Sequence, residues 1–243
     1  MKRELFTVVS NEKIARDVYR MTLLGNTEAI TATGQFVNLL IDGCYLRRPI
    51  SVCESVDGAL TLIYKVVGKG TELMSTYAQG TVLDILTGLG NGYDTSVSGD
   101  APLLIGGGVG VPPMYGLCKE LVAQGKQPTV VLGFNNVEDV FYENEFKALG
   151  AKVLVATADG SYGIKGFVTD AMKDISYTHF YTCGPEPMLK AVFGCTVTDG
   201  QFSFEERMGC GFGACMGCSC KTVTGYKRIC KEGPVLRKGE ILW

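Results

Sequence analysis

Five of the ten cysteines in the chain lie between residues 210 and 230. Cys210, Cys215 and Cys218 have the spacing C-x4-C-x2-C, and Cys230 follows after a gap. Four thiolates at this spacing are typical of a [2Fe–2S] cluster, whose ligand loop wraps around two irons. Glycines between these cysteines let the backbone come close, so that its N–H groups can point at the sulfur atoms. The spacing therefore predicts an iron–sulfur site.

A structural zinc site is the alternative, because four cysteines also suit zinc. Zinc ligands usually come as two closely spaced pairs, however, and only one side is paired here. Cys220 breaks the C-x4-C-x2-C pattern and is interpreted as a free or packed thiol. It is a fifth candidate ligand.

A glycine-rich loop follows an apolar run at 102–105 and precedes a helix expected at 112–122. Backbone N–H groups of such a loop, together with the helix N-terminus, form a site for a pyrophosphate. The loop lacks the full G-x-G-x-x-G pattern, so a tight turn without a ligand is the alternative interpretation. The candidate nucleotide-binding residues in this loop are Gly106, Gly107, Gly108 and Gly110.

A second segment, residues 183–186, follows the last apolar strand of the same region. We expect it at the same edge of the sheet as the glycine loop. Open α/β sheets bind their ligands at this carboxyl edge. Since no Arg or Lys follows the strand ending at Phe134, a 2′-phosphate has no evident partner, and NAD is favoured over NADP. The segment adds Cys183, Gly184, Pro185 and Glu186 to the candidate residues.

Three regions that differ in residue pattern must position these motifs. Residues 1–98 contain short β-branched and aromatic runs at 5–9, 18–23, 36–41, 60–64 and 81–86, which predict an antiparallel barrel of about six strands with a helix at 70–77. Residues 99–198 alternate strand and helix and predict a doubly wound parallel α/β sheet. Residues 199–243 are too few to form a core alone and need a metal or a neighbour.

The net charge and the pattern of apolar residues limit which classes of partner the protein can have. The formal net charge is -2, which favours neither nucleic acid nor an anionic membrane surface. No apolar run approaches the length of a membrane span, and the first residues lack the apolar segment of a secretory signal. We therefore expect a cytoplasmic protein, and in the reducing cytosol disulfides are a poor explanation for its ten cysteines.

The order of the motifs resembles the ferredoxin-reductase superfamily and, more closely, the electron-transfer subunits of dihydroorotate dehydrogenase B. The resemblance covers essentially the whole chain. It is sharpest at RRPIS (47–51), GKGT (68–71), GGGVGVPPM (106–114), DGSYGIKGFVTD (159–170), CGPEPM (183–188) and the tail from Cys230 to Val235.

The resemblance implies that residues 1–98 bind FAD, residues 99–198 bind NAD and residues 199–243 hold the cluster through Cys210, Cys215, Cys218 and Cys230. It places Arg48 at the FAD pyrophosphate and Ser51 near the flavin ring, with Lys65 where Arg is common. It also places Cys183 near the nicotinamide. The implied FAD contacts are Arg48, Pro49, Ile50, Ser51, Ile63, Tyr64, Lys65, Gly70 and Thr71.

The implied function is electron transfer in pyrimidine (UMP) biosynthesis. A partner catalytic subunit carrying FMN oxidises dihydroorotate, and electrons pass through [2Fe–2S] and FAD to NAD+, in a heterotetramer with two of each subunit. No acid–base pair is needed, and the only histidine, His179, is interpreted as structural. The alternatives are another FAD/[2Fe–2S] NAD(P)H reductase subunit, of ferredoxin or sulfide type, and a non-enzymatic regulatory subunit with a structural zinc or cluster.

Overall fold

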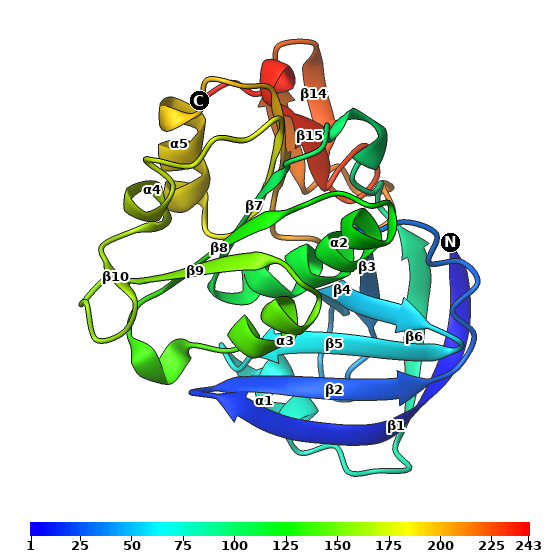
Figure 1. Ribbon diagram of the computed structural model, residues 1–243. Coiled ribbons are helices and arrows are strands. Elements are labelled where there is room, and N and C mark those ends of the chain that lie inside the picture. The colour runs from blue at the N-terminus through cyan, green and yellow to red at the C-terminus, as the bar shows by residue number, and fades with distance from the viewer.

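The first six strands close into a barrel in the order β1-β2-β5-β4-β3-β6, with antiparallel neighbours throughout. The computed structural model describes residues 1–243, and Figure 1 shows the barrel beside the parallel sheet. Alternate side chains fill the barrel, which confirms the expected fold. The elements are β1 (Lys2–Ala15), β2 (Val18–Leu24), β3 (Phe36–Leu39), β4 (Arg48–Val56), β5 (Ala59–Lys65), α1 (Lys69–Ser75) and β6 (Val82–Leu89).

The second unit is a seven-stranded sheet in the order β10-β9-β8-β7-β11-β12-β15, parallel except for the β12–β15 pair. Its strands are β7 (Leu103–Gly107), β8 (Thr129–Phe134), β9 (Lys152–Thr157), β10 (Ile164–Lys165), β11 (Phe180–Cys183), β12 (Gly200–Ser203) and β15 (Val235–Arg237). Its helices are α2 (Val111–Ala123), α3 (Glu143–Ala148), α4 (Val168–Ala171) and α5 (Glu186–Cys195).

The central strands of this sheet are buried on both faces, as a doubly wound sheet requires. Leu104 and Leu132 face one core together with α2 and α3, whereas Leu103 and Val131 face a second core together with α4 and α5. The predicted doubly wound parallel sheet is confirmed. None of its helices, nor α1, is long and apolar enough to cross a membrane.

The C-terminal segment does not stand alone. Its strands β12 and β15 extend the parallel sheet, and only the hairpin of β13 (Ser219–Thr222) and β14 (Gly225–Arg228) forms a separate ladder. Cys218 and Cys230 are buried in the same core as α4 and α5. Two strands of residues 199–243 thus belong to the larger sheet, and this sheet is the neighbour that so short a segment needs. The boundary near residue 199 stays a prediction.

Helix α2 joins the barrel to the sheet, as Figure 1 shows. Val18 and Ile63 of the barrel share a core with α2 and with the sheet. The approach is closest at Gly116, where a Cβ atom would lie 2.5 Å from the carbonyl oxygen of Cys53 on β4. Only a residue without a Cβ atom permits this close approach of α2 to β4.

Candidate functional site

The four candidate cluster cysteines lie in two pairs. The Sγ atom of Cys210 accepts hydrogen bonds from the backbone N–H groups of Ala214 at 3.2 Å and Cys215 at 3.4 Å. The N–H of Cys230 donates to the Sγ atom of Cys218 at 3.4 Å. Backbone N–H groups thus already point at sulfur, as in a loop that holds thiolates.

The electrostatics of the loop favour a thiolate at Cys210 but not at Cys230. Burial alone raises the pKa of Cys210, but N–H bonds from Phe212 and Cys215 bring it down to about 6. Burial and the neighbouring Cys218 thiol raise the pKa of Cys230 to about 12, so binding a positively charged iron there releases a proton.

The donor set fits two irons. Four thiols lie in two pairs with backbone N–H groups aimed at sulfur, and each iron of a [2Fe–2S] cluster takes two cysteines. Cys220 lies apart on β13, where its thiol bonds the carbonyl of Lys221 at 3.6 Å.

The two adjacent arginines of the RRPIS segment have different surroundings. Arg47 is held by Asp84, whose carboxylate it meets at 2.8 Å, and that carboxylate also binds Arg3. Arg48 makes no ion pair and bonds only the carbonyl groups of Leu46 and Arg47. Only Arg48 therefore has its charge free for a phosphate.

Gly70 makes room for the Arg48 side chain. A Cβ atom at Gly70 would lie 2.2 Å from Nε of Arg48 and 2.8 Å from its Cζ atom. The guanidinium thus lies against the first turn of α1, whose backbone N–H groups have no partner within the helix, and this cradle fits a diphosphate. It supports the expected FAD site at Arg48 and Gly70.

The other expected FAD residues differ in what they offer. The hydroxyl of Thr71 accepts from the N–H of Val67 at 2.9 Å and donates to the carbonyl of Gly68 at 3.0 Å, so it shapes the turn before α1. Ile63 and Tyr64 are buried in the cores, and only their backbone is available to a ligand. Pro49, Ile50 and Ser51 lie on β4 and are partly exposed.

The glycine loop and the 183–186 segment meet at the carboxyl edge of the sheet. A Cβ atom at Gly110 would lie 2.2 Å from the carbonyl oxygen of Cys183, and one at Gly184 would lie 3.2 Å from the N atom of Gly107. Gly106 lies behind them, against α2. Burial raises the pKa of Cys183 to about 12, so its thiol stays protonated near neutral pH.

A cavity of about 470 Å³ opens at this edge. Gly107, Gly108 and Pro185 line it, and Lys65 reaches it from the barrel. The other expected nucleotide-binding residues do not line it: Gly106, Gly110, Cys183, Gly184 and Glu186. The structure therefore brings the two nucleotide motifs and one expected FAD residue to a single cleft.

Several cleft residues were not among the candidate site residues. They include Asn135 and Asp139, which follow β8, and Gly166 and Phe167, which follow β10 and lie in the 159–170 motif of the resemblance. Position after a strand was the available signal, since all these loops end at the carboxyl edge. Asp139 is 8% exposed in its side chain and binds Arg16 at 3.0 Å.

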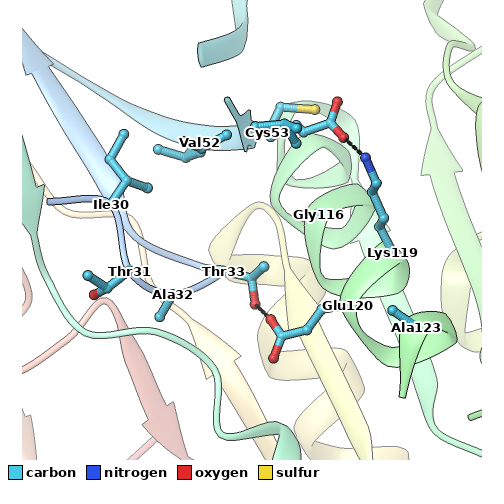
Figure 2. Close-up of a pocket in the computed structure, with 13 residues that line it drawn as sticks. Ile30, Thr31, Ala32, Thr33, Val52, Cys53, Gly116, Lys119, Glu120 and Ala123 are labelled. Carbon is cyan, nitrogen blue, oxygen red and sulfur yellow. Dashed lines mark hydrogen bonds and ion pairs between the residues drawn. The ribbon is translucent and has the colours of Figure 1, made fainter. Parts of the chain in front are cut away.

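A second, more open cleft of about 310 Å³ lies between the barrel and α2 (Figure 2). Its charged groups already have partners: Lys119 pairs with Glu54, and Thr33 donates to Glu120 at 2.8 Å. None of the expected site residues lines it. With all its charged groups paired, this cleft is best described as a seam between the two units.

His179 lies away from both motifs. It is buried just before β11, with its Nε2 atom 3.3 Å from the side-chain nitrogen of Gln201. Burial lowers its pKa. These surroundings agree with the structural role expected for it.

The chain is similar to known proteins along its whole length. Residues 205–242 match the iron-sulfur cluster binding domain of dihydroorotate dehydrogenase B, and residues 104–193 match the oxidoreductase NAD-binding domain. Relatives from Geobacillus sp. (strain WCH70) and Fusobacterium nucleatum are 45% and 43% identical over at least 99% of both chains. Both are named dihydroorotate dehydrogenase B (NAD(+)), electron transfer subunit.

Solved structures agree with the fold. A structure of NADH-dependent reduced ferredoxin-NADP oxidoreductase superposes with a TM-score of 0.88 at 29% identity, covering 98% of this chain and 90% of the other. A ferredoxin reductase of carbazole 1,9a-dioxygenase shares the fold at 21% identity and a TM-score of 0.68, over 79% of this chain and 64% of that one. The full-length identities show that this chain belongs to the family of dihydroorotate dehydrogenase B electron-transfer subunits.

Proposed function

We propose that this chain carries electrons from the FMN of a separate catalytic subunit, where dihydroorotate becomes orotate, to NAD+ during UMP biosynthesis. The observation that carries the proposal is the presence in one chain of two cysteine pairs, a free arginine against α1 and a dinucleotide cleft. The full-length relatives share the corresponding name. A regulatory role without redox chemistry needs neither the arginine cradle nor the cleft.

The residues have distinct tasks. We propose that Arg48 holds the FAD pyrophosphate, with Gly70 and Thr71 shaping its cradle, and that Cys210, Cys215, Cys218 and Cys230 hold the cluster. When bound, FAD exchanges a hydride with NAD(H) and single electrons with [2Fe–2S]. A nicotinamide alone cannot pass single electrons to the cluster. Lys65 ends β5 and lines the dinucleotide cleft, so it joins the two nucleotide sites.

The surface near the cluster loop supports a docking partner. Cys215 is exposed, and Phe212 and Met216 beside it are 43% and 54% exposed. Large apolar side chains grouped on a surface mark interaction sites. We propose that the FMN subunit docks there, in a heterotetramer with two copies of each chain. No two of the ten cysteines form a disulfide, which supports a cytoplasmic location.

The test separates the chain from the complex. Alone, the chain is expected to oxidise NADH with an artificial electron acceptor and to leave dihydroorotate unchanged. Adding the FMN subunit is expected to give dihydroorotate-dependent reduction of NAD+, with a mass by light scattering that fits two of each chain. If the two chains form a complex that passes no electrons from dihydroorotate to NAD+, the proposal is refuted. The chain would then serve a different redox partner.

A further inference from the structure

Strand β3 of the barrel faces two parts of the molecule. Val37 and Leu39 point into the barrel core. Phe36 packs into the core that contains the buried cluster cysteines, and Asn38, on the same outer face, contacts the loop of Cys210. Strand β3 is therefore the place where the barrel meets the cluster segment.

The amide of Asn38 is buried in an unusual way. Asn38 is 1% exposed, and its Nδ2 atom donates to the carbonyl oxygen of Cys210 at 3.4 Å. Its Oδ1 atom has no hydrogen-bond partner in the protein. A buried amide with one unmatched oxygen destabilises a fold, so its presence calls for another reason.

The loop is shaped to accept this amide. Gly211 has φ +78, and a Cβ atom there would lie 2.3 Å from Nδ2 of Asn38. On its other side Asn38 pairs with Pro49 in the β3–β4 register. Asn38 thus links the strand expected to contact the flavin with the first expected cluster ligand.

A second asparagine holds the other end of the cluster segment. Asn91 donates from Nδ2 to the carbonyl of Val235 at 2.8 Å and accepts from its N–H at 2.9 Å. Its own N–H donates to the carbonyl of Gly233 at 2.6 Å. Because these bonds do not involve Asn38, the segment stays attached when the Asn38 amide is removed.

We propose that Asn38 is a positioning residue that fixes Cys210, and with it the bound cluster, relative to the flavin-binding strand β4. The proposal rests on the proposed role of Cys210 as a ligand. Loss of an outer hydrogen bond to a metal site typically reduces affinity or activity about 10- to 100-fold. For Asn38→Leu we expect electron transfer from NADH-reduced flavin to the cluster to slow by about tenfold, within that range.

The experiment uses the full chain with its cofactors and three variants. Asn38→Leu removes both polar atoms at nearly the same size, and Asn38→Asp keeps the acceptor oxygen but cannot donate to Cys210. Val37→Ala is the control, because it opens the barrel core on the opposite face of the same strand. We would measure the iron content, the electron paramagnetic resonance spectrum of the reduced cluster and the temperature of thermal unfolding. Two rates are also measured, that of flavin reduction by NADH and that of electron transfer from flavin to cluster.

Both Asn38 variants are expected to shift the cluster spectrum and slow the flavin-to-cluster step, while flavin reduction by NADH keeps its rate. Asn38→Leu is expected to unfold no earlier than the wild type. The control is expected to unfold earlier with an unchanged spectrum. A wild-type spectrum in Asn38→Leu or Asn38→Asp, or an equal shift in Val37→Ala, overturns the proposal. A wild-type chain that binds no cluster instead overturns the ligand assignment.

Discussion

Replacing Gly70 by alanine separates flavin binding from fold stability. Gly70 lies in α1 without positive φ, so alanine is compatible with the backbone and adds roughly 0.5–1 kcal/mol of stability. The new Cβ atom would lie 2.2 Å from Nε of Arg48 and must push that side chain away. Since the end of an arginine moves easily, the fold tolerates the change, and the loss falls on the ligand.

The expected loss follows from the bond that Arg48 no longer makes. A hydrogen bond to a charged group contributes about 1.5–3 kcal/mol, and 1.4 kcal/mol is a factor of ten in Kd, so FAD is expected to bind roughly 10- to 100-fold more weakly. Flavin titration of the apoprotein measures the Kd, and thermal unfolding without flavin measures stability.

The matched control is Gly194→Ala. Gly194 is also a helical glycine, and a Cβ atom there would meet nothing within 4 Å. It is expected to gain similar stability and keep the wild-type FAD affinity. An unchanged FAD affinity in Gly70→Ala, or an equal loss in both variants, would refute the placement of the pyrophosphate beside Arg48.

Three further predictions concern other parts of the molecule. Cys215→Ser is expected to abolish cluster assembly and Cys220→Ser to leave it intact, as iron and sulfide content will show; cluster loss in both would contradict the ligand set. Gly110→Ala is expected to weaken NADH binding, because its Cβ atom would lie 2.2 Å from the carbonyl of Cys183, and an unchanged NADH affinity by titration would exclude that loop. Burial lowers the pKa of His179, so below the ordinary value of 6.5 the unfolded chain takes up a proton that the folded chain does not. Stability at this site should therefore fall as pH drops through that value; chemical denaturation at several pH values should show a shallower fall in His179→Gln.

Periodicity predicted most of the architecture. Strands such as β2 and β5 alternate apolar and polar residues, and those of the parallel sheet are continuously apolar, so local pattern suffices for both units. Strand β4 had no counterpart among the predicted runs, because Arg48 and Pro49 at its start hide the pattern. Strands β12 and β15 are four and three residues long, too short for a periodic signal.

The candidate site was predictable where its chemistry depends on spacing along the chain. The glycine loop does border a cavity at the carboxyl edge of the sheet, and the cysteines at 210–230 do lie in two pairs; the ligands of both stay predictions. Spacing could not show that Arg47 is neutralised by Asp84 while Arg48 stays free, because the two arginines are adjacent. Nor could it show the contact of Asn38 with Cys210, which joins residues 172 positions apart.

The most direct test is a visible spectrum of the anaerobically purified chain before and after NADH. We expect flavin bands together with a broad iron–sulfur absorbance, both bleached by NADH, because the cleft, the flavin cradle and the cysteine pairs belong to one electron path. Bleaching of the flavin alone, with iron–sulfur absorbance present and unchanged, would contradict that path. Flavin absorbance without any iron would contradict the proposed role of Cys210, Cys215, Cys218 and Cys230.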